Sequence, residues 1–113
     1  MIKVKIHCRN EDITVVEVKG HAGYAKHGRD IVCSAVSAIV QTALLAIIDI
    51  SGEKVRYTVN EEEGYVYFET PAPKDRDEGI KQQAVLRAMK LGVEDIEKGY
   101  SPYVKTEVEK ECL

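Results

Sequence analysis

Apolar and polar residues alternate along the first part of the chain. From Ile2 to Cys8 every second side chain is apolar, with lysine or histidine between. A period of two is typical of a strand with one buried face. A turn-forming segment, residues 10–12, follows, and a β-branched run from Ile13 to Val18 comes next. The pattern predicts an antiparallel hairpin.

The pattern changes at Asp30. Residues 20–29 contain three glycines and show no periodicity, which indicates a loop. Asp30 is a favoured N-cap residue, and the apolar segment after it predicts a helix from Ile31 to about Ile50, with Gly52 just past its end. Apolar side chains cover most of the circumference of this helix. We therefore expect it to be buried on more than one side, against a sheet and against a second helix or a partner subunit.

The second half of the chain repeats this order. Two strand-like runs, 55–59 and 65–70, flank a turn at residues 61–64. Residues 75–98 are rich in helix formers and predict an amphipathic helix. Its expected apolar face consists of four side chains at helical spacing: Ile80, Ala84, Ala88 and Leu91.

A run at 103–108 predicts a last strand, followed by a charged tail at 109–113. The element order is therefore β-β-α-β-β-α-β. Hairpins that alternate with single helices predict an α+β fold, a two-layer sandwich with a mostly antiparallel sheet and two helices on one face. The length suits a single domain over residues 1–113.

The composition narrows the class of protein. Hydrophobic residues make up 44% and charged residues 31%, as in soluble globular proteins. The net charge of -3 gives no sign of direct nucleic-acid binding, which favours a clustered basic excess. The N-terminus lacks the continuous apolar segment of a secretory signal. The longest apolar stretch, 39–50, is interrupted by polar residues and short for a membrane span, so we expect no membrane association.

The three cysteines, Cys8, Cys33 and Cys112, show no CxxC spacing. This argues against a disulfide framework and against a thiolate metal site. We therefore expect reduced thiols in a cytoplasmic protein, with no metal and no cofactor.

Cys33 is the candidate nucleophile. It follows the expected N-cap, Asp30, by three residues and so lies in the first helical turn. There, unpaired backbone N–H groups and the helix dipole favour a thiolate. The same N–H groups are expected to stabilise the oxyanion that forms when sulfur attacks a carbonyl. Asp30 is expected to fasten this turn and to fix the approach of the loop.

His21 is the candidate base, at the junction between the second strand and the loop. The loop can return it to within hydrogen-bond distance of Cys33. His27, inside the loop, is the second choice. Ser37 lies four residues after Cys33 on the same helix face, where its hydroxyl can orient a substrate, a water or the imidazole.

Each of these residues also has a purely structural interpretation. A free cysteine in an apolar helix is more often a small core residue, and a histidine after a strand is usually structural or solvated. Asp30 needs no catalytic role to cap a helix, and Ser37 can bond back to a helix carbonyl. His7 and Cys8 are a poorer pair, because neighbours in a strand point to opposite faces. The residues alone leave a Cys/His site and a structural role open.

Three segments resemble the bacterial ribosomal-processing cysteine protease family, Prp: GHAGYA at 20–25, G-x-D-I-V-C at 28–33 and Val36-Ser37. The similarity extends to length and element order over the whole chain. One departure is Ser34, which follows the cysteine where alanine is common in relatives. Serine is small enough to pack there.

The resemblance implies a catalytic dyad of His21 and Cys33, with Asp30 and Ser37 in supporting roles. It also implies a loop between the dyad residues that moves on substrate binding. The loop residues concerned are Gly23, Tyr24 and Gly28.

For function, the resemblance implies a homodimeric cysteine endopeptidase. Its substrate would be the precursor of a large-subunit ribosomal protein near the peptidyl-transferase region, from which it removes an N-terminal extension. Two alternatives stay open. One is a non-catalytic ribosome-associated binding module in which Cys33 is merely buried, and the other is a thiol hydrolase or acyltransferase that acts on another acyl substrate.

Overall fold

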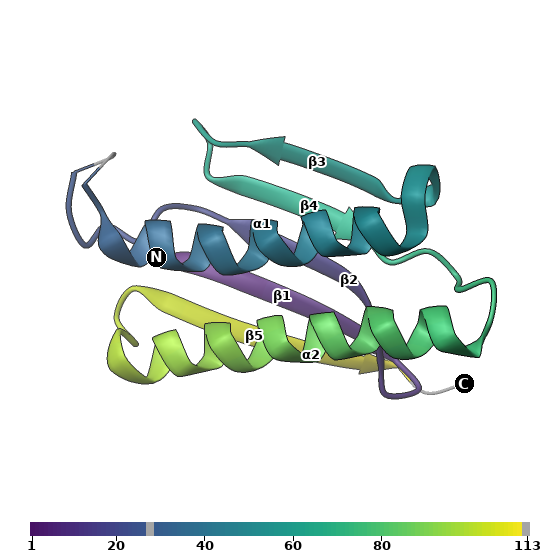
Figure 1. Ribbon diagram of the computed structural model, residues 1–113. Coiled ribbons are helices and arrows are strands. Elements are labelled where there is room, and N and C mark those ends of the chain that lie inside the picture. The colour runs from purple at the N-terminus through teal and green to yellow at the C-terminus, as the bar shows by residue number, and fades with distance from the viewer. Residues whose placement is uncertain (27–28, 112–113) are drawn as a thin grey trace.

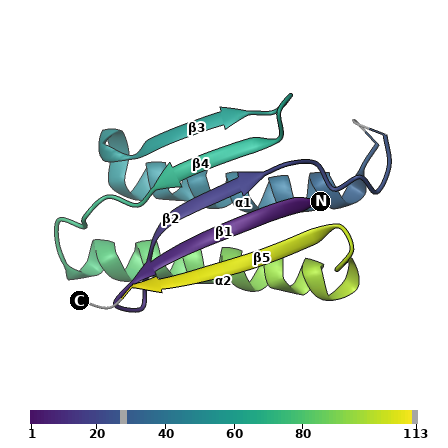
Figure 2. The same ribbon diagram turned by 180° about the vertical axis from the view of Figure 1, so that it is seen from behind.

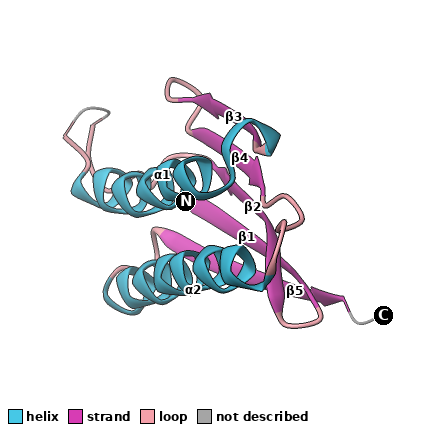
Figure 3. Ribbon diagram, turned by 45° about the vertical axis from the view of Figure 1, so that its right-hand side comes forward, coloured by secondary structure: helices cyan, strands magenta, loops and turns pink. Residues whose placement is uncertain are grey.

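A five-stranded sheet carries two helices on one of its faces (Figures 1 and 3). The computed structural model describes residues 1–26 and 29–111. Three residues considered above, His27, Gly28 and Cys112, therefore lie outside the described residues. Helices fill one layer and strands the other, which confirms the predicted α+β two-layer sandwich.

The elements follow one another in the predicted order. They are β1 (Ile2–Arg9), β2 (Asp12–Lys19), α1 (Ile31–Ser51), a short 3₁₀ helix η1 (Gly52–Lys54), β3 (Arg56–Asn60), β4 (Tyr65–Glu69), α2 (Arg76–Gly99) and β5 (Val104–Glu111). The charged tail expected at 109–113 is wrong in its first part, because β5 continues to Glu111. These residues pair with β1, and His7 lies 3.6 Å from Glu109 and 3.1 Å from Glu111.

The strands are arranged in the order β3-β4-β2-β1-β5. β1 and β5 run parallel, and the other neighbours are antiparallel. Alternation along β1 turns Ile2, Val4 and Ile6 towards the helices and the lysines between them towards the uncovered face, which Figure 2 shows from the front. Cys8 is buried and His7 is not, as expected of neighbours in a strand.

α1 buries an apolar side against the sheet and against α2, as its sequence predicts. By length and composition alone, the segment Ile31–Lys54 also qualifies as a membrane span, with a hydropathy of 2.3. This differs from the expectation drawn from residues 39–50, which considered only part of the apolar helix that begins at Ile31. The core helix of a soluble protein passes the same test, and 33% of this stretch is buried inside the structure.

The predicted apolar face of α2 is wrong. Its four side chains point to solvent, and Ile80 and Leu91 are 56% and 68% exposed. The buried side consists of Gln82, Leu86, Met89 and Val93. A polar residue can occupy the core side because the Gln82 amide donates to Ser51 Oγ at 2.8 Å and to the Pro71 carbonyl at 3.1 Å.

One end of the molecule gathers the loop after β2, the start of α1, the β3–β4 turn and the α2–β5 turn (Figure 1). Two contacts join these segments. Gly20 N–H donates to the Gly64 carbonyl at 2.9 Å, and Tyr24 packs against Tyr100 with ring centroids 5.7 Å apart. Candidate residues that lie apart in the sequence are therefore neighbours at this end.

Candidate active site

Asp30 is the N-cap of α1, as predicted, and it is almost completely buried. Its Oδ1 accepts from the backbone N–H groups of Val32 and Cys33, both at 3.0 Å. Its Oδ2 accepts from Tyr24 and Ala25 in the loop, at 3.0 and 3.2 Å. Burial alone would raise the pKa of this carboxyl, but the four N–H donors outweigh it and lower the pKa below its ordinary value. One carboxylate thus fastens both the helix start and the loop.

Cys33 lies in the first turn of α1 and is half-buried. Its Sγ accepts a hydrogen bond from Ala22 N–H at 3.1 Å. Burial raises the pKa of the thiol; the Ala22 N–H opposes this and the nearby Asp30 carboxylate adds to it. The surroundings of Cys33 thus favour the neutral thiol over the thiolate.

Backbone N–H groups in the first turn of α1 do not stabilise the Cys33 sulfur in the way that the sequence predicted. We expected its free N–H groups to stabilise a thiolate and an oxyanion, but those of Val32 and Cys33 donate to the Asp30 carboxylate, and that of Ser34 donates to the Asp30 carbonyl. The physical reason is that a capping carboxylate uses the same donors.

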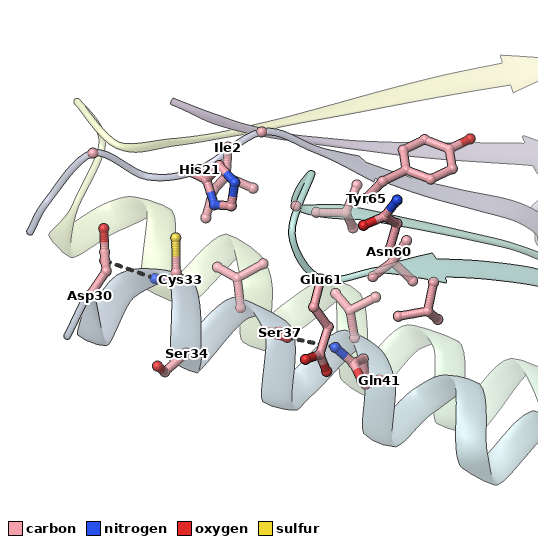
Figure 4. A pocket seen from close by; sticks show the side chains of 18 of the residues that line it. Ile2, His21, Asp30, Cys33, Ser34, Ser37, Gln41, Asn60, Glu61 and Tyr65 are labelled. Atoms are coloured by element: carbon pink, nitrogen blue, oxygen red, sulfur yellow. Dashed lines mark hydrogen bonds between the residues drawn. The ribbon is translucent and has the colours of Figure 1, made fainter. Parts of the chain in front are cut away.

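His21 follows the end of β2 by two residues. Gly20, with φ of +95°, makes the bend between them, and a Cβ there would lie 2.7 Å from the Met1 carbonyl oxygen. The exposed ring of His21 has its Nε2 3.1 Å from the carbonyl oxygen of Glu62 in the β3–β4 turn. Figure 4 shows the ring beside the sulfur of Cys33, on the same side of α1.

His21 and Cys33 line one cavity of about 320 Å³ between α1 and the β3–β4 hairpin. Apolar side chains such as Val36 and Val40 form much of its wall, and Asn60, Glu61 and Tyr65 contribute polar groups from the hairpin (Figure 4). A groove of this kind, with few polar groups and a candidate nucleophile at one end, suits a peptide segment.

Ser37 also lines this cavity, one helical turn from Cys33. Its Oγ accepts from Gln41 Nε2 at 2.7 Å. Ser37 thus shares the cavity with His21 and Cys33, and its hydroxyl is bonded further along the helix, to Gln41. Gln41 is a cavity residue that the sequence analysis did not single out.

Of the three predicted loop residues, the structure describes Gly23 and Tyr24. Gly23 has φ of +74° and open space around it. Tyr24 packs edge-to-face on Tyr100 and Tyr103, with centroids 5.7 and 5.2 Å apart, so the loop is anchored to the α2–β5 turn. Gly28 lies outside the described residues, as does the second candidate base, His27.

Besides Gln41, the residues missed from the sequence are those that act through the backbone. Nothing in a hairpin turn signals that the Glu62 carbonyl will meet a histidine forty-one positions earlier. The sequence places Gly64 in a predicted turn, but it does not indicate that Gly64 lies against Gly20 and His21. Among residues 1–26 and 29–111, no group of three or more His, Cys, Asp or Glu side chains could hold a metal ion.

A sequence model of the family described as cysteine protease Prp matches residues 1–105. The chain belongs to the Prp family of cysteine proteases. The ribosomal processing cysteine protease Prp of Bacillus subtilis (strain 168) is 36% identical over 91 residues, which cover 80% of this chain and 81% of the relative. The Prp of Staphylococcus aureus (strain Mu50) is 28% identical over 106 residues, 93% of this chain and 96% of the relative.

Solved structures agree with this assignment. A crystal structure of the essential ribosomal processing protease Prp from S. aureus, in complex with a covalently linked product peptide, has a TM-score of 0.83 at 25% identity, over 96% of this chain and 100% of that one. The structure of SMU.848 from Streptococcus mutans has a TM-score of 0.80 at 24% identity, over 98% and 96% of the two chains. The likeness to SMU.848 supports the fold alone. The family model and the Prp relatives confirm the predicted family and enzyme class.

Proposed function

We propose that this Prp family member is a cytoplasmic endopeptidase that removes an N-terminal extension from a large-subunit ribosomal protein. His21 and Cys33 are its catalytic dyad. The observation that carries the proposal is their position side by side at one end of the peptide-sized cavity (Figure 4). Support for the substrate comes from the relatives, which are named ribosomal processing proteases.

The mechanism begins with proton transfer. His21 takes the proton of the Cys33 thiol, since burial raises the pKa of that thiol and so favours its neutral form. The sulfur attacks the scissile carbonyl, and the tetrahedral intermediate collapses to a thioester as the protonated His21 gives its proton to the leaving amine. Water then hydrolyses the thioester and frees Cys33. A covalent stage agrees with the S. aureus relative, whose structure holds a covalently linked product peptide.

Asp30 and Ser37 have supporting roles in this proposal. Asp30 positions the cysteine and the loop through backbone N–H groups. Ser37 and its partner Gln41 offer hydrogen bonds to a peptide in the cavity. The loop containing Tyr24 moves when substrate enters, which requires separation of Tyr24 from Tyr100 and Tyr103.

The dyad is tested by substitution. Cys33→Ala is expected to abolish cleavage of the ribosomal protein precursor, read by mass spectrometry, while the variant keeps its fold and still binds the precursor. His21→Ala is expected to lower kcat by about 100-fold or more, the contribution of a positioned general base. Cleavage by Cys33→Ala at the wild-type rate would disprove the dyad.

Thiol labelling separates the enzyme from a binding module. With iodoacetamide, Cys33 is expected to react faster than the buried Cys8, and His21→Ala is expected to slow the labelling of Cys33 only. Equal and slow labelling of both cysteines would favour the binding module. If Cys33 labels quickly but the precursor stays intact, the substrate is another acyl compound.

A homodimer is the proposed state of assembly. Large apolar side chains on the outer faces of both helices support it, since Leu45 is 66% exposed and Leu91 is 68% exposed.

A further inference from the structure

A Cys/His dyad works only when its histidine ring is correctly oriented. An exposed imidazole just beyond a strand end rotates about two bonds and exists in two neutral tautomers, of which only one presents a lone pair to the cysteine in a given ring orientation. A neighbouring group must favour one ring position and one tautomer. The backbone around His21 supplies a group with that ability.

We propose that the main-chain carbonyl of Glu62 orients His21 and fixes its tautomer, and that Gly64 is the positioning residue that brings this carbonyl into place. The proposal rests on the assignment of His21 as the base. The contact is the Nε2–O distance of 3.1 Å between the ring and the Glu62 carbonyl. A carbonyl only accepts hydrogen bonds, so Nε2 carries the hydrogen. The lone pair of the neutral ring is then on Nδ1, which is the nitrogen that takes the thiol proton.

The carbonyl is held by the sheet. β2 pairs with β4 up to Lys19 and Tyr65, and the pairing extends one step further through Gly20 N–H and the Gly64 carbonyl, 2.9 Å apart. The turn is closed within itself as well, because Glu63 N–H donates to Asn60 Oδ1 at 3.2 Å and Gly64 N–H donates to the Glu61 carbonyl at 3.2 Å. The acceptor for His21 therefore belongs to a rigid hairpin and not to the loop that carries the histidine.

Gly64 permits the close approach of the β3–β4 turn to Gly20 and His21. A Cβ at this position would lie 2.5 Å from the Gly20 carbonyl oxygen and 3.0 Å from Cε1 of His21, and its φ is +62°. The first distance is too short for any side chain, and the neighbour there is backbone that cannot turn aside. Any larger residue must push the hairpin away from Gly20 and His21. This displacement lengthens the hydrogen bond to Glu62.

The arrangement has a chemical consequence during turnover. While the Glu62 carbonyl holds the Nε2 hydrogen, the proton that His21 gains and later delivers is always the one on Nδ1. A ring freed from the carbonyl spends part of its time with the hydrogen on Nδ1, and in that form Nδ1 has no lone pair with which to accept the thiol proton. The loss is expected in kcat, because the carbonyl does not touch the substrate.

The test compares Gly64→Ala with Gly52→Ala. Gly52 has nearly the same positive φ, +71°, but nothing lies within 4 Å of the point where its Cβ would stand, so Gly52→Ala carries the backbone strain without the clash. For Gly64→Ala we expect kcat on the precursor to fall about 10- to 100-fold, the effect of misplacing a catalytic group by roughly 1 Å, with KM changed less than about twofold. Gly52→Ala is expected to keep the wild-type kcat.

A second readout reports the tautomer without substrate. The ¹⁵N chemical shifts of the neutral His21 ring, assigned by their loss in His21→Ala, are expected to show hydrogen on Nε2 in the wild type and a mixture in Gly64→Ala. Cys33→Ala is expected to keep the Nε2–H form, so this result does not depend on the nucleophile. Where Gly64→Ala fails to fold, Asn60→Ala, which opens the turn without a clash, is expected to shift the tautomer in the same direction.

Hydrogen on Nδ1 in the wild type would overturn the proposal, as would a Gly64→Ala enzyme that folds and keeps the wild-type kcat. These outcomes differ from a failure of the dyad itself. If Cys33→Ala still cleaves the precursor, the proposed function fails, whatever the tautomer of His21.

Discussion

Asp30 makes more hydrogen bonds than a helix N-cap requires. Two of its four donors belong to α1 and two to the loop. The second pair connects the segment after His21 to the segment before Cys33, so one side chain sets the spacing between His21 and Cys33. The sequence predicted the cap from residue type, because Asp before an apolar helix is a local signal.

Asp30→Asn is expected to separate these two roles. An amide oxygen still caps α1, but the amide NH₂ would face the N–H groups of Tyr24 and Ala25, so the loop bonds are lost. We expect the free energy of unfolding at pH 7 to fall by about 1–3 kcal/mol, the cost of buried groups left unpaired. Urea titration measures it, and Asp75→Asn, at the exposed cap of α2, is the control with little effect.

The stability difference between the wild type and Asp30→Asn is expected to depend on pH. Because the folded pKa of Asp30 is lowered, its contribution is fully present above the ordinary value of 3.8 and is lost as pH falls through the lower folded value. The stability difference between wild type and Asp30→Asn should therefore shrink below about pH 3.8. A difference that stays constant down to about pH 2 would contradict the lowered pKa.

The elements were predictable because each has its own period and its own end signals. The side that each element buries was less predictable. Ile80 and Leu91 were expected on the buried face of α2 but lie on its exposed face. The opposite face, which carries Gln82, can be buried because Ser51 and Pro71, from other parts of the chain, accept hydrogen bonds from the Gln82 amide. The partners of the helix-start N–H groups and the meeting of His21 with Glu62 are likewise tertiary facts. Local patterns do not contain them.

Gln82 joins α2 to the end of α1 and to the connection after β4. Gln82→Met keeps the length of the side chain but leaves the Ser51 hydroxyl and the Pro71 carbonyl without their donor. We expect a loss of about 1–3 kcal/mol in urea unfolding, and an unchanged kcat because the cavity is at the opposite end of the sheet. The control Lys81→Met, on the exposed neighbour, should change stability by less than about 0.5 kcal/mol.

At the scale of the whole molecule, the helix layer presents apolar residues on its outer side as well as its inner one. Light scattering after size exclusion is expected to give the mass of two chains. Leu45→Glu and Leu91→Glu, measured separately, place a charge on each helix, and at least one of them should give the mass of one chain. Lys81→Glu serves as the polar control. A wild-type protein with the mass of one chain at all concentrations would contradict the homodimer.

The parallel pair of β1 and β5 sets the order in which the molecule can form. His7 and Glu111, which meet across this pair, are 104 positions apart in the sequence. Pairing across such a distance is slow, because a long loop must close before the contact stabilises anything. During synthesis the β1 side of the sheet stays open until β5 has left the ribosome, although every residue that lines the cavity has already emerged. A protease proposed to act on ribosomal proteins thus completes its own sheet only after β5, the last of its described strands, has emerged from a ribosome.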